Sequence, residues 1–152
     1  MARYFLESSV MLDRYLVQRP VASPRREEEE PSAVFARAAV SSLPPSMVSS
    51  LTLLETRGVL ARMSRNNPEV EDALRLLEVE EASLEVWEAT SEDWGMAMRL
   101  AVERKLKGAD ALQLAIYMRA RIKHNDLMLA TADRELLDAC RDLDLAAINP
   151  RG

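Results

Sequence analysis

Four acidic side chains of this sequence stand where a carboxylate is costly or has a special role. Glu7 ends a short apolar run, RYFL, and Asp133 follows another, LMLAT. Glu55 lies among apolar residues at helical spacing, where a charge is unfavourable unless it is paired or bound to a metal. Asp110 begins an alanine-rich stretch, and a helix N-terminus favours carboxylates and phosphates alike. The four acids together are typical of an oxygen-ligand set for a hard cation, Mg²⁺ or Mn²⁺.

Each of these acids also has a simpler explanation when it is taken alone. Asp133 is suited to cap the helix that follows it, and Asp110 to interact with a helix dipole through the first turn. Glu55 could form an ion pair with a nearby arginine such as Arg57, and Glu7 could be an ordinary acid at a strand end. The metal-site hypothesis therefore depends on all four acids converging in space.

The elements that must position the acids alternate between strands and helices. We predict buried strands in the opening RYFLESSVM and at residues 47–50, 83–87, 127–131 and 146–148. This alternation favours an α/β domain over residues 1–152, with a mainly parallel sheet that helices cover on both faces. The strand ends that carry Glu7 and Asp133 then lie at the carboxyl edge of the sheet, where open parallel sheets place their ligand sites.

Seven helices are predicted between these strands, and residues 19–32 are predicted to be an exposed connection because they contain three prolines and the run Glu27–Glu30. The helices cover residues 11–17, 33–40, 51–65, 68–77, 91–107, 109–122 and 133–143, with Ser91 as the cap of the fifth. The predicted core-facing stripe of the third helix is Leu51, Leu54, Gly58 and Ala61.

Composition narrows the class of protein further. The single cysteine, Cys140, excludes an internal disulfide framework and suits a reducing compartment. No apolar run approaches the roughly 20 residues of a membrane span, and the N-terminus lacks the pattern of a signal peptide, so we expect a soluble cytoplasmic protein without membrane contact. Residues 69–93 contain ten acids and one base, whereas residues 99–123 contain seven bases and two acids. This polarity could give one basic face for phosphates, or it could be a set of ordinary solvated helix faces.

Four segments resemble the successive motifs of PIN domains and cover nearly the whole chain in the family's order. RYFLESSVMLDRYL is similar to the opening strand and helix, SSLTLLETRGVLAR to the second motif with its acid at Glu55, and GADALQLAI to the third with Asp110. LMLATADRELLDACRDLDL resembles the fourth motif, with Thr131 and Asp133, and AAINP is similar to the closing strand. The sequence departs from the pattern at Glu7, where PIN enzymes have aspartate.

The resemblance implies a PIN-like three-layer α/β/α fold with a central, mainly parallel sheet. It also implies metal-dependent cleavage of RNA, with Glu7, Glu55, Asp110 and Asp133 as catalytic metal ligands for Mg²⁺ or Mn²⁺, and with Ser9 and Thr131 orienting ligands or bound water. Length and compactness look most like the VapC-type ribonuclease toxins of toxin–antitoxin pairs, which implies a homodimer and a cognate antitoxin.

Five basic residues are candidates for contact with the RNA substrate, and they are Arg14, Arg57, Arg104, Lys105 and Lys107. The main alternative is a PIN-fold module that binds RNA or a protein partner without cleaving, and Glu7 is the feature that favours it. A nucleotide-binding α/β protein is disfavoured because the first strand is followed by ESSV and not by a glycine-rich phosphate loop. A zinc enzyme is disfavoured because the chain has one histidine and one cysteine.

Overall fold

The computed structural model describes residues 2–16 and 30–152. The end of the first predicted helix at Val17 and most of the predicted connection at residues 19–32, including Glu27–Glu29, lie outside the described residues. The last two residues of that connection are not exposed loop, because Pro31 and Ser32 already belong to a helix. Across the part of the chain that the structure describes, no helix is both long and apolar enough to cross a membrane.

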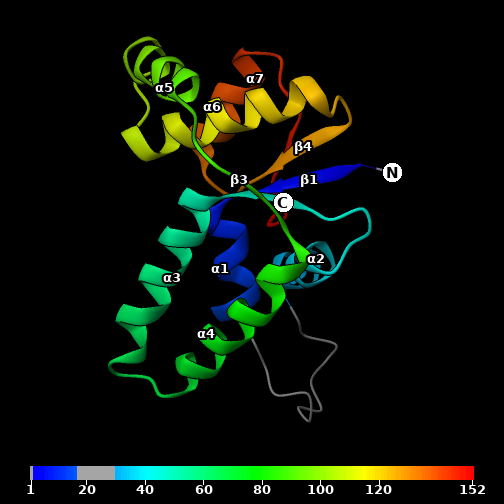
Figure 1. Ribbon diagram of the computed structural model, residues 1–152, viewed down its shortest axis with the longest axis vertical. Coiled ribbons are helices and arrows are strands. Elements are labelled where there is room, and N and C mark those ends of the chain that lie inside the picture. The colour runs from blue at the N-terminus through cyan, green and yellow to red at the C-terminus, as the bar shows by residue number, and fades with distance from the viewer. Residues whose placement is uncertain (1, 17–29) are drawn as a thin grey trace.

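A five-stranded sheet lies at the centre of the molecule, in the order β3-β2-β1-β4-β5 (Figure 1). Every neighbouring pair is parallel, which confirms the predicted sheet. Because all strands run the same way, their carboxyl ends meet at one edge. The strands are β1 Arg3–Leu6, β2 Met47–Ser49, β3 Glu85–Trp87, β4 Leu127–Ala130 and β5 Ala147–Ile148.

Helices cover both faces of the sheet, as predicted for a three-layer α/β/α fold. Figure 1 shows α1, α2, α3 and α4 on one side and α5, α6 and α7 on the other. Their bounds are α1 Ser8–Leu16, α2 Pro31–Val40, α3 Ser50–Ser64, α4 Glu69–Glu80, α5 Ser91–Glu103, α6 Gly108–Lys123 and α7 Arg134–Asp142. A short 3₁₀ helix, Glu81–Ser83, follows α4.

Alternate residues of the strands supply two separate cores, because successive side chains of a strand point to opposite faces. Phe5 and Leu129 belong to the core beneath α5, α6 and α7. Their neighbours Leu6 and Ala130 belong to the core beneath α1 to α4. All four side chains are completely buried, so the two layers of helices fix the register and direction of the central strands.

The buried face of α3 is not the one that the sequence predicted. Leu54 of the expected stripe is 69% exposed. Two threonines, Thr52 and Thr56, are part of the buried face. Burial of Thr56 is favourable enough because its hydroxyl is hydrogen-bonded within the helix: Thr56 Oγ1 donates to the Thr52 carbonyl oxygen at 2.7 Å. The residues of α3 that are buried are Thr52, Leu53, Thr56 and Leu60.

Local hydrogen bonds place the ends of α5 differently from the prediction. The cap is Thr90 and not Ser91: Thr90 Oγ1 accepts from the Asp93 N–H at 3.2 Å, and the Asp93 carboxylate accepts from the Thr90 N–H at 2.9 Å. This reciprocal pair satisfies two free donors at the helix start. At the other end α5 stops at Glu103, short of Lys107, because Lys105 adopts a left-handed backbone with φ of 55°.

Candidate metal centre

The four predicted acids all lie at the carboxyl edge of the sheet. Glu7 directly follows β1, and its backbone N–H donates to the Ala130 carbonyl oxygen at the end of β4 at 3.1 Å. Asp133 follows β4 and precedes α7, while Asp110 lies in the first turn of α6. Glu55 lies in α3, the helix that starts where β2 ends. Parallel strand direction therefore brings residues from four distant stretches of the chain to one place.

The carboxylate of Glu7 is held by hydrogen bonds from three neighbouring residues. Its Oε2 accepts from the Ser9 N–H at 3.0 Å, from Ser9 Oγ at 2.5 Å and from Thr131 Oγ1 at 2.8 Å. Its Oε1 accepts from Ser8 Oγ at 2.7 Å. Glu7 is only 7% exposed, so these donors compensate for the water that its carboxylate loses on burial. Ser9 and Thr131 contact Glu7 directly, and their predicted role in orienting metal ligands stays a prediction.

The same hydroxyls fix the loop that carries Asp133. Thr131 Oγ1 donates to Glu7 and accepts from the Asp133 N–H at 3.0 Å. Ser9 Oγ accepts from the Ala132 N–H at 2.9 Å. Thr131 is completely buried, so this network has little freedom to rearrange. The side chain of Glu7 thereby determines where the backbone of Asp133 lies.

Asp133 caps α7 as its simpler explanation predicted, because its Oδ1 accepts from the Leu136 N–H at 3.0 Å. The cap does not exclude a role in the site. One carboxylate oxygen from each of Asp110, Asp133 and Glu135 lies within 4.8 Å of the other two. Oxygens at this separation fit around a divalent cation whose metal–oxygen bonds are about 2.0 to 2.6 Å long.

Glu135 is a site residue that reasoning from the sequence missed. It is exposed, and it lies in the first turn of α7, two positions after Asp133. A signal for it was present in the sequence, because an acid in the first turn of the helix that Asp133 caps must lie close to Asp133. Glu7 and Glu55 are not members of the close group of three, but Glu7 and Glu55 each interact electrostatically with Asp110.

The acids perturb one another's protonation. Burial, followed by the charges of Asp133 and Glu7, raises the pKa of Asp110 to about 6, against a smaller lowering by Lys107. Burial, followed by the charges of Glu7 and Asp110, raises the pKa of Glu55. A raised pKa from like charges means that these carboxylates share one region and repel each other there. The four predicted acids therefore act on one another at the carboxyl edge, and their role as metal ligands stays a prediction.

The described arginines form their ion pairs with acids outside this group. Among the described residues, none of the four predicted acids forms an ion pair. The suggested pair between Glu55 and Arg57 is absent from the described ion pairs, and Arg57 binds Glu81 after α4 instead. Arg14 is likewise engaged, with its Nη2 at 3.1 Å from Glu80 Oε2. Both arginines therefore have partners in the α1–α4 layer.

The other predicted RNA-binding residues lie closer to the acids. Arg104 and Lys105 line a hollow of about 280 Å³, whose wall also includes Glu135. Lys107 lies at the start of α6, where its charge lowers the pKa of Asp110 against the larger effect of burial. These three bases flank the acid group, and their contact with RNA stays a prediction.

Arg151 is a second residue that the sequence did not single out. It follows β5, so it lies at the carboxyl edge that carries the acids. Its guanidinium binds both oxygens of the buried Asp13, at 2.7 and 2.9 Å. The hydrogen bond to Asp13 and, to a smaller extent, the charge of Glu7 raise the pKa of Arg151. Its side chain is 52% exposed, so part of this positive charge faces solvent next to Glu7.

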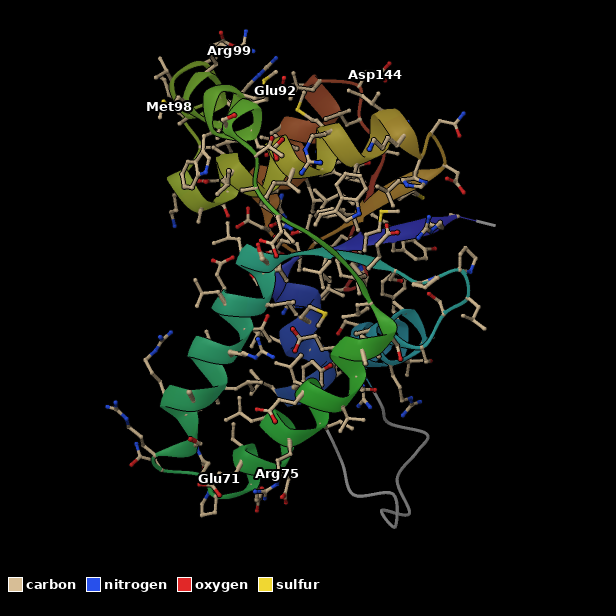
Figure 2. All side chains as sticks on the ribbon, in the orientation of Figure 1. Glu71, Arg75, Glu92, Met98, Arg99 and Asp144 are labelled. Atoms are coloured by element: carbon tan, nitrogen blue, oxygen red, sulfur yellow. The ribbon has the colours of Figure 1, made fainter. Side chains whose placement is uncertain are left out.

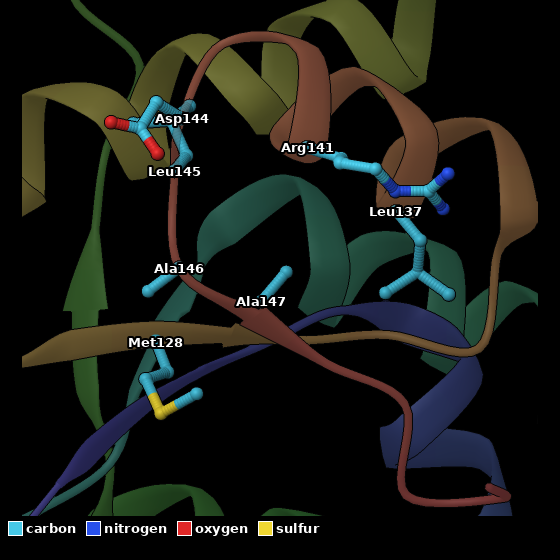
Figure 3. A pocket seen from close by; sticks show the side chains of 7 residues that line it. All are labelled: Met128, Leu137, Arg141, Asp144, Leu145, Ala146 and Ala147. Atoms are coloured by element: carbon cyan, nitrogen blue, oxygen red, sulfur yellow. The ribbon is translucent and has the colours of Figure 1, made fainter.

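A larger hollow of about 480 Å³ lies beside β5, away from the acids (Figure 3). Its wall contains apolar side chains and two charged residues, Arg141 and Asp144, which do not belong to the acid group. The lining residues are Met128, Leu137, Arg141, Asp144, Leu145, Ala146 and Ala147. None of the acids at the strand ends lines this hollow.

The comparison with protein families agrees with this fold. The model of the PIN domain matches residues 25–142, and the chain belongs to the PIN domain family. No curated protein matches the sequence. The family assignment therefore rests on the family model, and the order of the strands and helices agrees with it.

Several solved structures share the fold at low sequence identity. PAE2754 from Pyrobaculum aerophilum is 22% identical, with a TM-score of 0.62 over 90% of this chain and 85% of its own. A toxin–antitoxin complex from Klebsiella pneumoniae is 17% identical, with a TM-score of 0.59 over 97% of each chain. VapC20 of Mycobacterium tuberculosis, a toxin that cleaves the sarcin-ricin loop, is 19% identical, with a TM-score of 0.57 over 90% of this chain and 94% of its own.

Proposed function

We propose that this protein is a metal-dependent endoribonuclease and the toxin of a type II toxin–antitoxin pair. The observation that carries the proposal is the group of acids at the carboxyl edge. Burial and the charges of neighbouring acids raise the pKa values of Glu55 and Asp110, and no described arginine forms an ion pair with the group. Membership of the PIN family and the likeness to VapC20 and to toxin–antitoxin complexes support the same function.

The residues present fit Mg²⁺ or Mn²⁺, because carboxylate oxygens are the ligands that these hard cations prefer. Asp110, Asp133 and Glu135 are the residues whose oxygens lie close enough to share one ion, with Glu7 and Glu55 beside them. A divalent ion in such a site activates water and stabilises negative charge on a scissile phosphate.

The chain's own groups prepare the site for an RNA phosphodiester. Ser9 and Thr131 hold Glu7 and the loop of Asp133 in one arrangement, so the acids need not reorganise when substrate binds. Lys107 and Arg151 supply positive charge beside the acids, and we propose that they contact phosphates on either side of the scissile bond. Arg104 and Lys105 would extend this contact along the hollow next to Glu135.

The proposed partners follow from the same class of protein. RNA is the substrate, and a cognate antitoxin is the protein partner, as in the toxin–antitoxin complexes of similar fold. An antitoxin would counter the site most directly by placing positive side chains against the unpaired acids. We also propose that the protein forms a homodimer.

A second candidate function is a PIN-fold module that binds without cleaving, and one observation favours it. Glu7 stands where PIN enzymes have aspartate, and three donors already occupy its Oε2. A carboxylate so engaged has less capacity to bind a cation. Cleavage by the natural chain in Mn²⁺ separates the two functions, because a binding module does not cleave. Glu7→Asp then tests the cause, since it raises or restores cleavage if the longer side chain is the handicap.

The direct test is cleavage of a panel of structured RNAs in Mn²⁺ and in chelator. We expect cleavage that requires Mn²⁺ and falls by more than about 100-fold in Asp110→Asn. Loss of a residue that only hydrogen-bonds to a metal ligand reduces activity by about 10- to 100-fold, and loss of a ligand itself should reduce it more. The matched control is Asp72→Asn, which removes an exposed carboxylate on α4 and should leave cleavage unchanged. Equal rates with Mn²⁺ and with chelator would contradict the proposal.

A further inference from the structure

Gln113 is a polar residue buried in the core of the molecule. Glu92 and Arg99 of the neighbouring helix α5 are exposed, and Figure 2 shows them at the outer surface. Gln113 of α6, by contrast, is only 2% exposed, and the residues on either side of it, Leu112 and Leu114, are buried apolar side chains. Glutamine is seldom found in such surroundings. Its position in the core therefore needs an explanation other than apolar packing.

A short hydrogen bond joins Gln113 to the opposite layer of helices. The Ser49 hydroxyl donates to Gln113 Oε1 at 2.6 Å, and Ser49 is completely buried. Ser49 ends β2 and caps α3, since its Oγ also accepts from the Thr52 N–H at 3.0 Å. The bond therefore connects α6 of one layer to the start of α3 in the other (Figure 1). A hydrogen bond that is shielded from water holds its two partners in a well-defined arrangement.

Each end of this connection lies about one helical turn from an acid of the candidate metal centre. Asp110 is three residues before Gln113 on α6, and Glu55 is three residues after Thr52 on α3. Residues three apart lie on the same side of a helix, about 4.5 Å apart along its axis. The charges of Glu55 and Asp110 act on one another, so the two carboxylates face one region. The bond therefore joins the two helices close to the acids that they carry.

The stability of the core does not require an amide at this position. Gln113 Nε2 is buried and has no hydrogen-bond partner among the described residues, and an unpaired buried donor costs free energy. Leucine has nearly the same size and would bring no unpaired group. Ser49 has a second acceptor within reach, Thr52 Oγ1 at 3.3 Å, so its hydroxyl does not depend on Gln113. The bond between Ser49 and Gln113 therefore fixes an arrangement more than it stabilises the core.

We propose that Gln113 is a positioning residue of the metal centre, which sets the separation of the Glu55 and Asp110 carboxylates because it ties α6 to α3 through Ser49. The inference rests on the proposed function, since a defined separation matters only if the two acids act together on a cation or its bound water. Groups in such sites must be held within about 0.5 Å of their working positions. Apolar packing allows helices to slide past one another by small amounts, and a directional hydrogen bond between them prevents this.

The first test measures metal binding and stability of Gln113→Leu separately. Binding is followed through the electron paramagnetic resonance signal of free Mn²⁺, and stability through urea denaturation in chelator. We expect Gln113→Leu to bind Mn²⁺ about tenfold more weakly than the natural chain, as is typical when a residue that orients a metal ligand is lost. It should unfold at nearly the same urea concentration, because the variant loses one hydrogen bond and also loses an unpaired buried donor.

Ser46→Ala is the matched control at the other end of β2. Ser46 is 1% exposed and precedes the strand, and its hydroxyl donates to the Ala39 carbonyl oxygen at 2.8 Å. This variant loses a buried hydrogen bond at the amino edge of the sheet, so it should unfold at a lower urea concentration and bind Mn²⁺ as the natural chain does. A purely structural role for Gln113 predicts that same result for Gln113→Leu.

The second test combines Gln113→Leu with Ser49→Ala, which removes the other end of the bond. Each single variant should weaken Mn²⁺ binding, and the double variant should bind no more weakly than the weaker of the two, because both changes remove one connection. In RNA cleavage, kcat of Gln113→Leu should fall about tenfold while KM stays the same, since the bases proposed to contact phosphates are unchanged.

The outcomes distinguish failure of this inference from failure of the proposed function. Gln113→Leu overturns the inference alone if it binds Mn²⁺ as tightly as the natural chain, or if it does not fold in chelator. Losses of Mn²⁺ affinity that add up in the double variant also overturn it, because they assign separate roles to Ser49 and Gln113. A natural chain that neither binds Mn²⁺ nor cleaves RNA contradicts the proposed function, and the inference fails with it.

Discussion

Acidic residues in two regions of this molecule have opposite surroundings. Two acids of the helical layers pair with arginines: Glu80 with Arg14 in the α1–α4 layer, and the buried Asp93 with Arg119 in the layer of α5 and α6. At the carboxyl edge of the sheet, the charged neighbours of Asp110 include other acids, Asp133 and Glu135. The same residue type thus serves stability in one region and produces repulsion in the other.

The difference is one of placement and not of a shortage of bases. The chain has 20 lysines and arginines against 25 acids, and several arginines bind carboxylates elsewhere in the fold. Unpaired acids held together raise the free energy of the folded state, and a bound cation would remove that cost. A group of unpaired acids that destabilises the folded state, and that hydrogen bonds hold in place, is therefore typical of a binding site for a cation.

The largest loss of stability is expected where a buried acid loses its arginine partner. Asp93 is 3% exposed and accepts from Thr90 and from Arg119; burial opposes its charge, but these hydrogen bonds outweigh it and lower the pKa of Asp93. We expect Asp93→Ala to lower the free energy of unfolding by about 3 kcal/mol, since it removes one half of the capping pair with Thr90 and leaves Arg119 without its carboxylate partner. Urea denaturation measures this loss.

The control for that prediction is Asp72→Ala, which breaks an exposed pair with Arg75. Exposed pairs contribute about 0 to 1 kcal/mol, so this variant should unfold nearly as the natural protein does. Equal losses in the two variants would mean that burial does not distinguish these pairs.

The acid group should be the place where a cation acts. Glu135→Gln keeps the shape of the side chain and removes a charged ligand, so we expect Mn²⁺ affinity to fall by about tenfold, or about 1.4 kcal/mol. Thermal unfolding over a Mn²⁺ titration measures this affinity, since a ligand bound only by the folded state stabilises it. Asp138→Asn is the control on the same helix, where Asp138 pairs with Arg141. An unchanged titration in Glu135→Gln would remove Glu135 from the site.

Without a cation, the acid group should lower stability at neutral pH. Burial and the neighbouring acids raise the pKa of Asp110 from 3.8 to about 6. The folded state therefore binds more protons than the unfolded state between about pH 4 and pH 6, and stability falls as the pH rises through that window. Allowing for solvent screening of this partly exposed group, we expect Asp110→Asn to gain about 1 kcal/mol at pH 7 in chelator.

Below about pH 4 this gain should vanish, because Asp110 is then protonated in both states. Urea denaturation in chelator at pH 7 and at acidic pH measures the difference, with Asp126→Asn in the exposed turn before β4 as the control. A variant that is less stable than the natural protein at pH 7 would show that Asp110 has a favourable partner.

Much of the fold and part of the site were predictable from local patterns. The alternation of strands and helices, the parallel sheet and the edge to which Glu7 and Asp133 belong followed from apolar periodicity and from the position of each acid at an element's end. The cap at Asp133 was predictable for the same reason, since a cap involves residues three positions apart.

Contacts between distant residues were not predictable, and tertiary structure alone decided them. Arg151 binds Asp13 across 138 positions of the chain, and Thr131 bonds to Glu7 across 124. The buried face of α3 was also not predictable from apolar spacing, because threonines that hydrogen-bond to their own helix can be buried as easily as leucine. Sequence determines which elements form, since periodicity is local; which charges meet and which remain unpaired depends on how those elements pack.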